Sequence, residues 1–561
     1  KTKKQKLVSR YIYEHLFQAH LHFAGTDTRE FYRLVRSTTP PGQPVSIIAT
    51  RRPYGEVKGE VYYRILRQQG SIVAKTHMVY PLSDKRMARL QALFYDVDYE
   101  VSELPSYRPE IASNPMLAFA AIPVKSRYRF LLDDARFFIE GFIKGPVCRG
   151  QIALNVIEDQ FWVAFFDPEA PIASNSDAFL RNNAADMAMP SELEDTFRFL
   201  SVDLHYKNLF RQYAGKYDER LADFRPVALK DAMAYLWKGD SWNHKAGSNP
   251  NTALTIFRHL DSASVNFGWL GDYPETAWFI DYSVLERIHY LLVAGFDVYG
   301  NAGHQLNTRL YMDLLRTEGE DNFLAFLPPA TRQKLYHDWY QGIRKSNRDD
   351  VGQVQWRGKE LVNGYRTDDP QRELYRTVAK ALSLKGDFIN RCEPDNCPPP
   401  ADENRLRVAR AMQKAEKMAI GIMQYLPDLV FVRVRTGANP EQDLAYTLVY
   451  NKAYRNVSNM MQSEKPGERR DYAMDTQTIL PWLEGVYPSF FYVVDLDDIE
   501  TFVEEFNAIS NRQEYEVFVG RYGIRRTNEK FWQQADWFNA QYAREEPLLS
   551  GIYDLNRYQN R

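Results

Sequence analysis

The chain has 561 residues, more than a single hydrophobic core usually serves, so we expect about two to four domains. It is 44% hydrophobic and 26% charged, as in an ordinary globular protein, and its net charge of −2 gives no reason to expect nucleic acid as a partner. Its longest apolar run, 116–124, is far shorter than the roughly 18 residues that a membrane-spanning helix requires. We therefore expect a protein that is soluble or attached to a membrane surface.

The first 240 residues mix predicted helices with predicted strands. Apolar residues spaced three and four apart predict a helix over 8–23 and another over 127–143. Short runs rich in β-branched and aromatic residues predict strands. These runs are 30–35, 45–50, 60–66, 71–80 and 160–166.

The rest of the chain divides into a helical part and a compact module. The pattern is almost wholly helical from 241 to 425, including 278–296 and 404–426, and the prolines after Cys397 interrupt it. After Pro427 it predicts strand, strand, helix and strand over 428–435, 444–451, 497–509 and 514–523. The expected fold class is α+β, with a mixed region over 1–240, a mainly helical region over 241–426 and an α+β module over 427–561.

The motifs of common enzyme classes are missing from the sequence. It has no G-x-G-x-x-G, Walker loop, G-x-S-x-G or H-E-x-x-H. One E-x-x-H spacing joins Glu286 to His289 on a predicted helix, but a carboxylate-bridged di-iron bundle needs two such spacings and two further glutamates. We therefore interpret Glu286 and His289 as an ion pair on one helix face.

Three histidines lie in the first predicted helix. At 100° per residue, His15 and His22 fall on one flank of the apolar stripe and His20 on the other. His15 and His22 are about 10 Å apart along the helix axis, which is too far for both to ligate one ion from a straight helix. We interpret these histidines as residues at the boundary of a buried helix.

His77 and Met78 are different in kind, because either side chain could serve as an axial ligand to haem iron. They are neighbours in a predicted strand. Neighbouring side chains of a strand face opposite sides, so at most one of the two points at any given site.

The three cysteines fall into two groups. Cys148 lies between Lys144 and Arg149, whose charges would favour a reactive thiolate, although a free cysteine is also a common small core residue. Cys392 and Cys397 lie in a proline-rich stretch, where they could form a disulfide or stay reduced. Zinc is less favoured there, because a closed site needs four ligands and no second pair or histidine is near.

Several segments resemble the fatty acid cis/trans isomerases. The likeness is collinear and runs from about Leu7 to the C-terminus. The segments that carry it are 7–23, 33–56, 61–65, 75–80 and 127–166, the last of which contains KGPVCRGQ.

This resemblance implies a bacterial periplasmic isomerase that converts cis-unsaturated acyl chains of membrane lipids to trans without moving the double bond. The implied partners are membrane phospholipids or free unsaturated fatty acids, with peripheral attachment to the membrane and no nucleic acid. The high content of aromatic residues suits an apolar slot for an acyl chain.

The family is also haem-dependent through a C-x-x-C-H motif, and this chain contains no such motif. We expect the attachment site of haem c to lie upstream of Lys1. An oxidising haem iron could withdraw electron density from the alkene and so allow rotation about the double bond. The residues expected to contact the haem are His77, Met78 and His15.

The expected catalytic residues are Cys148, Arg149, Lys144 and His77. Lys144 and Arg149 could hold a phosphate or a haem propionate through charge-assisted hydrogen bonds. Two alternatives remain open: a haem-free lipid-binding or scaffold protein, and an acyl-transfer enzyme that uses Cys148 as its nucleophile with a histidine such as His77. The implied periplasmic location predicts a disulfide between Cys392 and Cys397, with Cys148 left as a free thiol.

Overall fold

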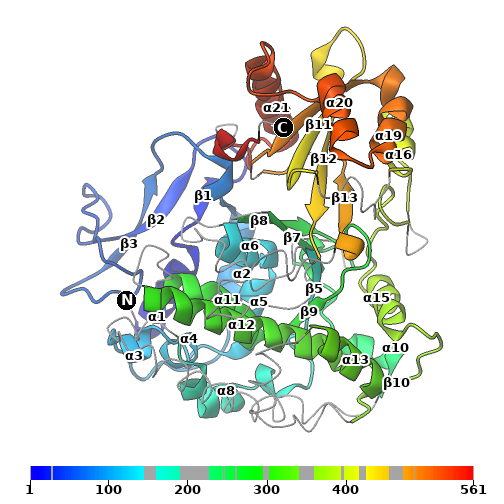
Figure 1. The fold of residues 1–561 in the computed structure, drawn as a ribbon. Coiled ribbons are helices and arrows are strands. Elements are labelled where there is room, and N and C mark those ends of the chain that lie inside the picture. The colour runs from blue at the N-terminus through cyan, green and yellow to red at the C-terminus, as the bar shows by residue number, and fades with distance from the viewer. Residues whose placement is uncertain are drawn as a thin grey trace.

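The computed structural model shows three four-stranded sheets with helices packed around them, which confirms the α+β class (Figure 1). The structure describes residues 2–559 except 27–28, 145–159, 190–226, 243, 245–246, 260–261, 295–301, 340–358, 393–396, 416–424, 454–471 and 486.

The N-terminal helix is shorter than its sequence pattern predicts. Helix α1 (Lys3–Leu16) begins at a capping box, in which the Thr2 side chain accepts from the Gln5 backbone and the Gln5 side chain accepts in return. The chain then turns into strand β1 (His20–Phe23), so the prediction of helix over 8–23 is wrong at its end. Strand β1 pairs in parallel with residues 79–82, and such a distant partner is invisible to a local pattern.

Strand β1 belongs to a sheet with the order β3-β2-β1-β4. The strands predicted over 30–35 and 60–66 are confirmed. The segment 45–50 makes a single bridge, and of 71–80 only 79–80 belong to a strand, after an isolated bridge at Val73 and a 3-10 turn (Ala74–Thr76). The bounds are β2 (Tyr32–Ser37), β3 (Tyr62–Arg67) and β4 (Val79–Leu82).

Helices then pack against this sheet and against one another. The predicted helix over 127–143 is two helices, because the chain breaks at Asp133 and Asp134. Both carboxylates bind arginines of α2: Asp133 accepts from Arg89 and Asp134 from Arg86. The helices of this part are α2 (Asp84–Phe94), α3 (Pro109–Ala112), α4 (Pro115–Ala118), α5 (Val124–Leu132), α6 (Ala135–Lys144) and α8 (Asp177–Asn183).

The middle sheet has the order β8-β7-β5-β9 and corrects the prediction of an almost wholly helical segment over 241–425. Nearly every residue of its strands is buried, so the alternation of apolar and polar residues that marks a strand is missing. The strands are β5 (Gln160–Phe165), β7 (Ala253–His259), β8 (Ser262–Phe267) and β9 (Ala277–Ile280).

Most of the helices in this part of the chain follow the middle sheet, as predicted. Two strands of two residues each pair residues 227–228 with residues 362–363. Helix α12 packs along β9, and α11 packs against α6. The helices are α10 (Leu229–Ala232), α11 (Tyr282–Val293), α12 (Ala302–Leu324), α13 (Pro329–Trp339), α15 (Pro370–Ala381) and α16 (Glu403–Met412), and the short strands are β6 (Val227–Ala228) and β10 (Val362–Asn363).

The C-terminal module carries a third sheet with the order β13-β12-β11-β14. The strand predicted over 514–523 is wrong, because these residues lie in helix α20. Asn511 caps that helix, and Tyr515, Phe518, Val519 and Tyr522 bury one face at helical spacing. The elements are β11 (Leu429–Arg435), β12 (Leu444–Asn451), β13 (Thr476–Leu480), β14 (Phe490–Asp495), α19 (Ile499–Ala508), α20 (Arg512–Tyr522) and α21 (Phe531–Glu545).

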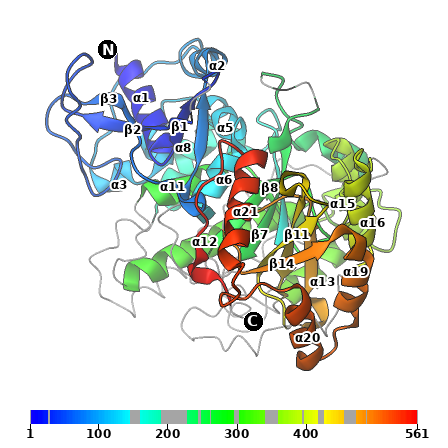
Figure 2. The same cartoon turned by 90° about the horizontal axis from the view of Figure 1, so that it is seen from above.

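Two hydrophobic cores hold these layers together. The first contains residues from Leu7 to Leu382, so one core spans the boundary predicted at 240. The second runs mainly from Ile389 to Tyr558 and includes α16, which precedes the boundary predicted at 426. Seen from above, the C-terminal helix α21 reaches over the N-terminal half of the chain (Figure 2).

Cys392 and Cys397 form a disulfide, which confirms that prediction. Among the helices that the structure describes, none is both long and apolar enough to cross a membrane.

The C-terminal tail returns to the N-terminal half of the chain and pairs with it. Ile552 forms a parallel bridge with Val73, in which the Ile552 N–H donates to the Ile72 carbonyl (2.8 Å) and the Ala74 N–H donates to the Ile552 carbonyl (3.0 Å). Gly551 permits this approach, because a Cβ atom there would lie 2.6 Å from the Ala74 nitrogen.

We predict that Gly551→Ala destabilises the protein by about 1–3 kcal/mol, since the added methyl group overlaps backbone atoms that cannot move aside. Thermal unfolding and the rate of carboxypeptidase digestion would report it, with a lower midpoint and faster loss of the tail. The matched control is Gly520→Ala on α20, where a Cβ atom meets nothing within 4 Å. Alanine should be neutral or stabilising there, because it is the better helix former. Equal effects of the two changes would contradict this account of the tail.

Candidate functional site

Helices α1, α6 and α11 meet in the first core, around a cluster of buried polar side chains. Phe138 of α6 packs edge-on against His289 of α11 at 5.0 Å between ring centroids. One turn later, a Cβ atom at Gly141 would lie 3.7 Å from Leu292. Helices α6 and α11 therefore run in the same direction, and their carboxyl ends lie together.

A carboxylate of α11 joins α11 to α1. Glu286 Oε1 lies 2.8 Å from His15 Nε2, and Glu286 Oε2 accepts from the Tyr11 hydroxyl at 3.1 Å. His15 Nδ1 lies 2.7 Å from the Tyr11 carbonyl oxygen. All of these side chains are buried.

This geometry defines the protonation state of the pair. Both partners of the His15 ring are acceptors, so both ring nitrogens are placed to donate. Burial alone would raise the pKa of Glu286, but the charge and hydrogen bond of His15, with Arg127 and Tyr11, outweigh it and hold that pKa below its ordinary value. The result is a buried ion pair between His15 and Glu286.

A second histidine, His289, lies beside this pair and is uncharged. The rings of His289 and His15 stack with 5.1 Å between centroids. Within the described chain, neither ring nitrogen of His289 makes a well-formed hydrogen bond. Burial, and then the charge of His15, lower the pKa of His289 well below its ordinary value, against a smaller opposing effect of the Glu14 and His15 carbonyls. His289 is therefore a neutral imidazole.

A second buried carboxylate fastens the same two helices. Glu14 of α1 accepts from Arg10 at 2.8 Å and lies 2.6 Å from the hydroxyl of Tyr290 on α11. Each of its two oxygens thus has a hydrogen-bond partner, one on α1 and one on α11.

Met78 reaches the same cluster from the N-terminal sheet, past a glycine of α6. A Cβ atom at Gly141 would lie 3.1 Å from the Met78 methyl carbon and 3.9 Å from His289 Nδ1. The glycine therefore makes room for a thioether and an imidazole on one face of α6. Of the predicted site residues, the structure brings His15 and Met78 to this cluster.

His77 points the other way, as predicted for neighbouring residues of an extended segment. Its Nε2 lies 2.8 Å from the Leu548 carbonyl oxygen, and its Nδ1 lies 2.5 Å from Nδ1 of His20. Because a carbonyl only accepts, Nε2 of His77 donates to it. In the neutral His77 ring, Nδ1 then accepts a hydrogen bond from the Nδ1–H of His20. His77 therefore connects β1 to the C-terminal tail.

The predicted haem contacts do not fit iron ligation in this structure. His15 and His77 use both ring nitrogens in hydrogen bonds, which leaves neither a lone pair for a metal. Met78 is buried against Gly141. Within the described parts of the chain, no group of three or more histidine, cysteine or acidic side chains could hold a metal ion.

The remaining predicted residues lie at the edge of what the structure describes. Lys144 is the last residue of α6, one turn after Gly141. Cys148 and Arg149 lie outside the described residues.

Sequence reasoning found parts of the cluster and misassigned its pairing. The E-x-x-H spacing drew attention to Glu286 and His289, but Glu286 pairs with His15 of another helix and His289 has no such partner. Tyr11 and Glu14 were missed. Their signal is the spacing of Tyr11, Glu14 and His15, which places these three side chains on one face of the helix, the face that the structure buries.

The low pKa of His289 makes the stability of the protein dependent on pH. The unfolded chain takes up a proton below about pH 6.5 that the folded chain excludes, so stability is complete above that pH and falls as the pH drops. From His289 alone we predict a loss of up to about 1.4 kcal/mol for each pH unit below 6.5.

His289→Leu should remove this contribution without loss of stability at pH 7.5, because an apolar side chain replaces a buried imidazole that lacks partners. Unfolding midpoints at pH 7.5, 6.5 and 5.5 would measure it. His337→Leu, at an exposed position of α13, controls for loss of a histidine in general. An unchanged pH dependence in His289→Leu would show that the imidazole is not held neutral.

Comparison with known proteins gives one match. The family model "Fatty acid cis/trans isomerase (CTI)" matches residues 1–560. No curated protein and no solved structure matches the chain. Because the family match covers the whole chain, with α1, α6 and α11 and the cluster between them, the protein belongs to the fatty acid cis/trans isomerase family and is an enzyme of that activity.

Proposed function

We propose that the enzyme converts cis-unsaturated acyl chains of membrane phospholipids to trans, without moving the double bond, at the buried cluster of α1, α6 and α11. The observation that carries this assignment is His289, a neutral imidazole whose ring nitrogens make no well-formed hydrogen bond within the described chain. It lies with Met78 about Gly141 of α6, which is one helical turn before Lys144. Lys144 lies about 4.5 Å along the axis from Gly141, at a rise of 1.5 Å per residue. Lys144, the last described residue of α6, is therefore one helical turn from the cluster.

The proton chemistry of the cluster suits this reaction. Rotation about the double bond needs its π order to be lowered for a moment, whereas removal of an allylic proton would allow the double bond to move along the chain. A group with a low pKa is a weak base, so His289 can lie against an alkene without taking that proton. The carboxylates of Glu14 and Glu286 are held by hydrogen bonds to α1 and α11 side chains.

The cluster also excludes water from its surroundings. Phe138 packs against His289, and Met78 and Leu292 lie about Gly141. We assign to these side chains the role of holding an acyl chain in an apolar setting near the end of α6. His15 and Glu286 are positioning residues, since they fix α1 against α11 and keep His289 neutral.

The periplasm and a peripheral attachment to the membrane are part of the proposal. The disulfide between Cys392 and Cys397 supports an oxidising compartment. Attachment to the membrane surface would place the enzyme next to phospholipids.

A role for haem c is supported by the family resemblance alone. Iron ligation by His15 or His77 would require one of their hydrogen bonds to break. We therefore assign no step of the reaction to a haem held by these residues.

The cysteine-based alternative is less favoured by the position of His77. A general base must have a nitrogen lone pair within reach of the thiol. Both ring nitrogens of His77 are engaged, one with His20 and one with the Leu548 carbonyl. Acyl transfer through Cys148 would therefore need another base.

Incubation of the complete gene product with vesicles that contain cis-vaccenoyl or palmitoleoyl phospholipid tests the activity. Gas chromatography should show trans fatty acids, and mass spectrometry of derivatised double bonds should show their positions unchanged. Heat-denatured enzyme is the control. Absence of trans product would favour the lipid-binding or scaffold alternative.

A second prediction separates the isomerase from the thiol enzyme. Cys148→Ser should keep measurable isomerisation, whereas a covalent thiol nucleophile would lose turnover because an unactivated hydroxyl is far weaker. Arg149→Ala should lose most of the activity, through a lost contact to the lipid phosphate. Circular dichroism must show that both variants fold. A folded Cys148→Ser protein without activity would overturn this assignment.

A further inference from the structure

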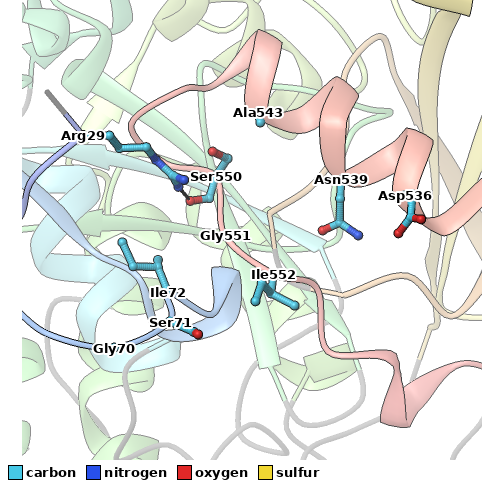
Figure 3. A pocket seen from close by; sticks show the side chains of 10 residues that line it. All are labelled: Arg29, Gly70, Ser71, Ile72, Asp536, Asn539, Ala543, Ser550, Gly551 and Ile552. Carbon is cyan, nitrogen blue, oxygen red and sulfur yellow. Dashed lines mark hydrogen bonds between the residues drawn. The ribbon is translucent and has the colours of Figure 1, made fainter. Parts of the chain in front are cut away.

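A groove of about 610 Å³ runs between the N-terminal sheet region, helix α21 and the C-terminal tail (Figure 3). We call it the seam groove. One face of α21 forms one wall, since Asp536, Asn539 and Ala543 recur at helical spacing. Ile72 and Ile552 lie opposite. The groove is lined by Arg29, Gly70, Ser71, Ile72, Asp536, Asn539, Ala543, Ser550, Gly551 and Ile552.

The floor of the seam groove is built by backbone pairing. The bridge between Val73 and Ile552 holds the tail against residues 72–74, and Gly551 permits the close approach. Arg29 adds a hydrogen bond from its guanidinium to the Ser550 carbonyl, as Figure 3 shows. This pairing fixes the groove before a ligand arrives, which lowers the entropic cost of binding.

The same pairing holds aliphatic side chains in contact with water. Ile552 is 57% exposed and Val73 is 40% exposed. Ile552 lines the seam groove together with Ile72 and the small residues Gly70, Gly551 and Ala543, and the polar residues Arg29, Ser71, Asp536, Asn539 and Ser550 complete the lining. The apolar part of this lining suits an alkyl chain, because its burial removes apolar surface from water on both sides.

A second cavity of about 380 Å³ adjoins the first and has a polar lining. The two share Arg29, Gly70 and Ile72. The second cavity adds Glu30 and Arg67, which form an ion pair at 2.6 Å, together with Phe31, Gln68 and Gln69. A groove that presents Ile72, Ala543 and Ile552 among polar residues thus continues into a charged site, so the matching ligand is amphipathic.

We propose that the seam groove binds one membrane phospholipid with a zwitterionic head group, with an acyl chain along Ile72 and Ile552 and the phosphate at Arg29 and Arg67. The charges decide the class of head group. Both arginines can donate to a phosphate, and Glu30 can accept from an ammonium group such as that of phosphoethanolamine. A fatty acid carboxylate would leave Glu30 beside an added negative charge.

This inference deepens the proposed function, because it names the lipid class and a site that holds it. The groove lies apart from the cluster around His289, so it can be tested by binding alone. Diheptanoyl phosphatidylethanolamine, kept below its critical micelle concentration, is a soluble probe for isothermal titration calorimetry with the complete protein.

The matched pair of variants is Ala543→Trp and Ala540→Trp. Both alanines are exposed on α21, but only Ala543 lines the groove. We expect Ala543→Trp to weaken binding of the probe at least about tenfold, since the indole fills the space of the acyl chain. Ala540→Trp should bind like the wild type. Thermal unfolding would show that both variants fold, and equal affinities of the two would overturn the proposal.

Charge is tested by Arg67→Ala against Arg512→Ala, an exposed arginine of α20 that also pairs with a glutamate. Arg67→Ala should weaken binding about two- to fivefold, as expected for an exposed charge contact, and Arg512→Ala should have no effect. Heptanoate and phosphoethanolamine alone should bind much more weakly than the intact probe. Binding of heptanoate as tight as that of the phospholipid would overturn the choice of head group.

Failure of this proposal and of the proposed function give different results. If the wild-type enzyme forms trans product and Ala543→Trp binds the probe unchanged, the proposed lipid site in the groove is rejected and the proposed isomerase activity is supported. If Ala543→Trp abolishes binding of the probe but the wild type forms no trans product, the lipid site in the groove is supported and the proposed reaction is rejected.

Discussion

The buried pair of His15 and Glu286 is the constraint on which the rest of the site depends. A carboxylate deep in an apolar core is stable only with a cation and hydrogen bonds around it, and loss of one partner of such a pair costs about 3–5 kcal/mol. The two residues are 271 positions apart, so their contact holds α1 against α11. A fixed positive charge on His15 then makes a second charge on the stacked His289 unfavourable. Burial lowers the pKa of His289 most, and the charge of His15 lowers it further, so the pair reinforces the neutral state of His289.

A buried cluster with a hydrogen-bonded ion pair and a neighbouring imidazole of low pKa suits isomerisation better than hydrolysis or acyl transfer. Those reactions need a base that moves a proton between water, nucleophile and leaving group. Here the polar groups next to His289 bind one another across α1 and α11, and Gly141 admits Met78 instead of a polar side chain. The family's reaction consumes no water and transfers no group, so a site without a mobile proton is consistent with it.

The sequence predicted the elements whose signals are local and failed where the partner lies far along the chain. Strands β2, β3, β5, β11 and β12 follow from composition and spacing. The disulfide follows from the spacing of its cysteines together with the location that the family resemblance implies. Strands β7, β8 and β9 do not, because buried strands have the same apolar residues on both faces. Helix α20 was taken as a strand for its Tyr and Val content, although its cap at Asn511 and the exposed Val517 fit a helix. At the site, E-x-x-H spacing identified Glu286 and His289, but a pairing between helices cannot be read from one helix.

Residues 77 and 78 connect the buried cluster around His289 with the seam groove. Met78 packs toward Gly141 and His289, while His77, its neighbour, donates to the Leu548 carbonyl at the start of the tail that forms the seam groove. A short extended segment presents successive side chains to opposite sides, so one dipeptide contacts both places. Ile72 in the groove floor lies five residues before His77, and the 3-10 turn Ala74–Thr76 lies between them. A change in the position of the tail would therefore act on the backbone that positions Met78 at the cluster. That arrangement provides a physical route by which a lipid held in the groove and the chemistry at α6 could influence each other, because both depend on the same segment of chain.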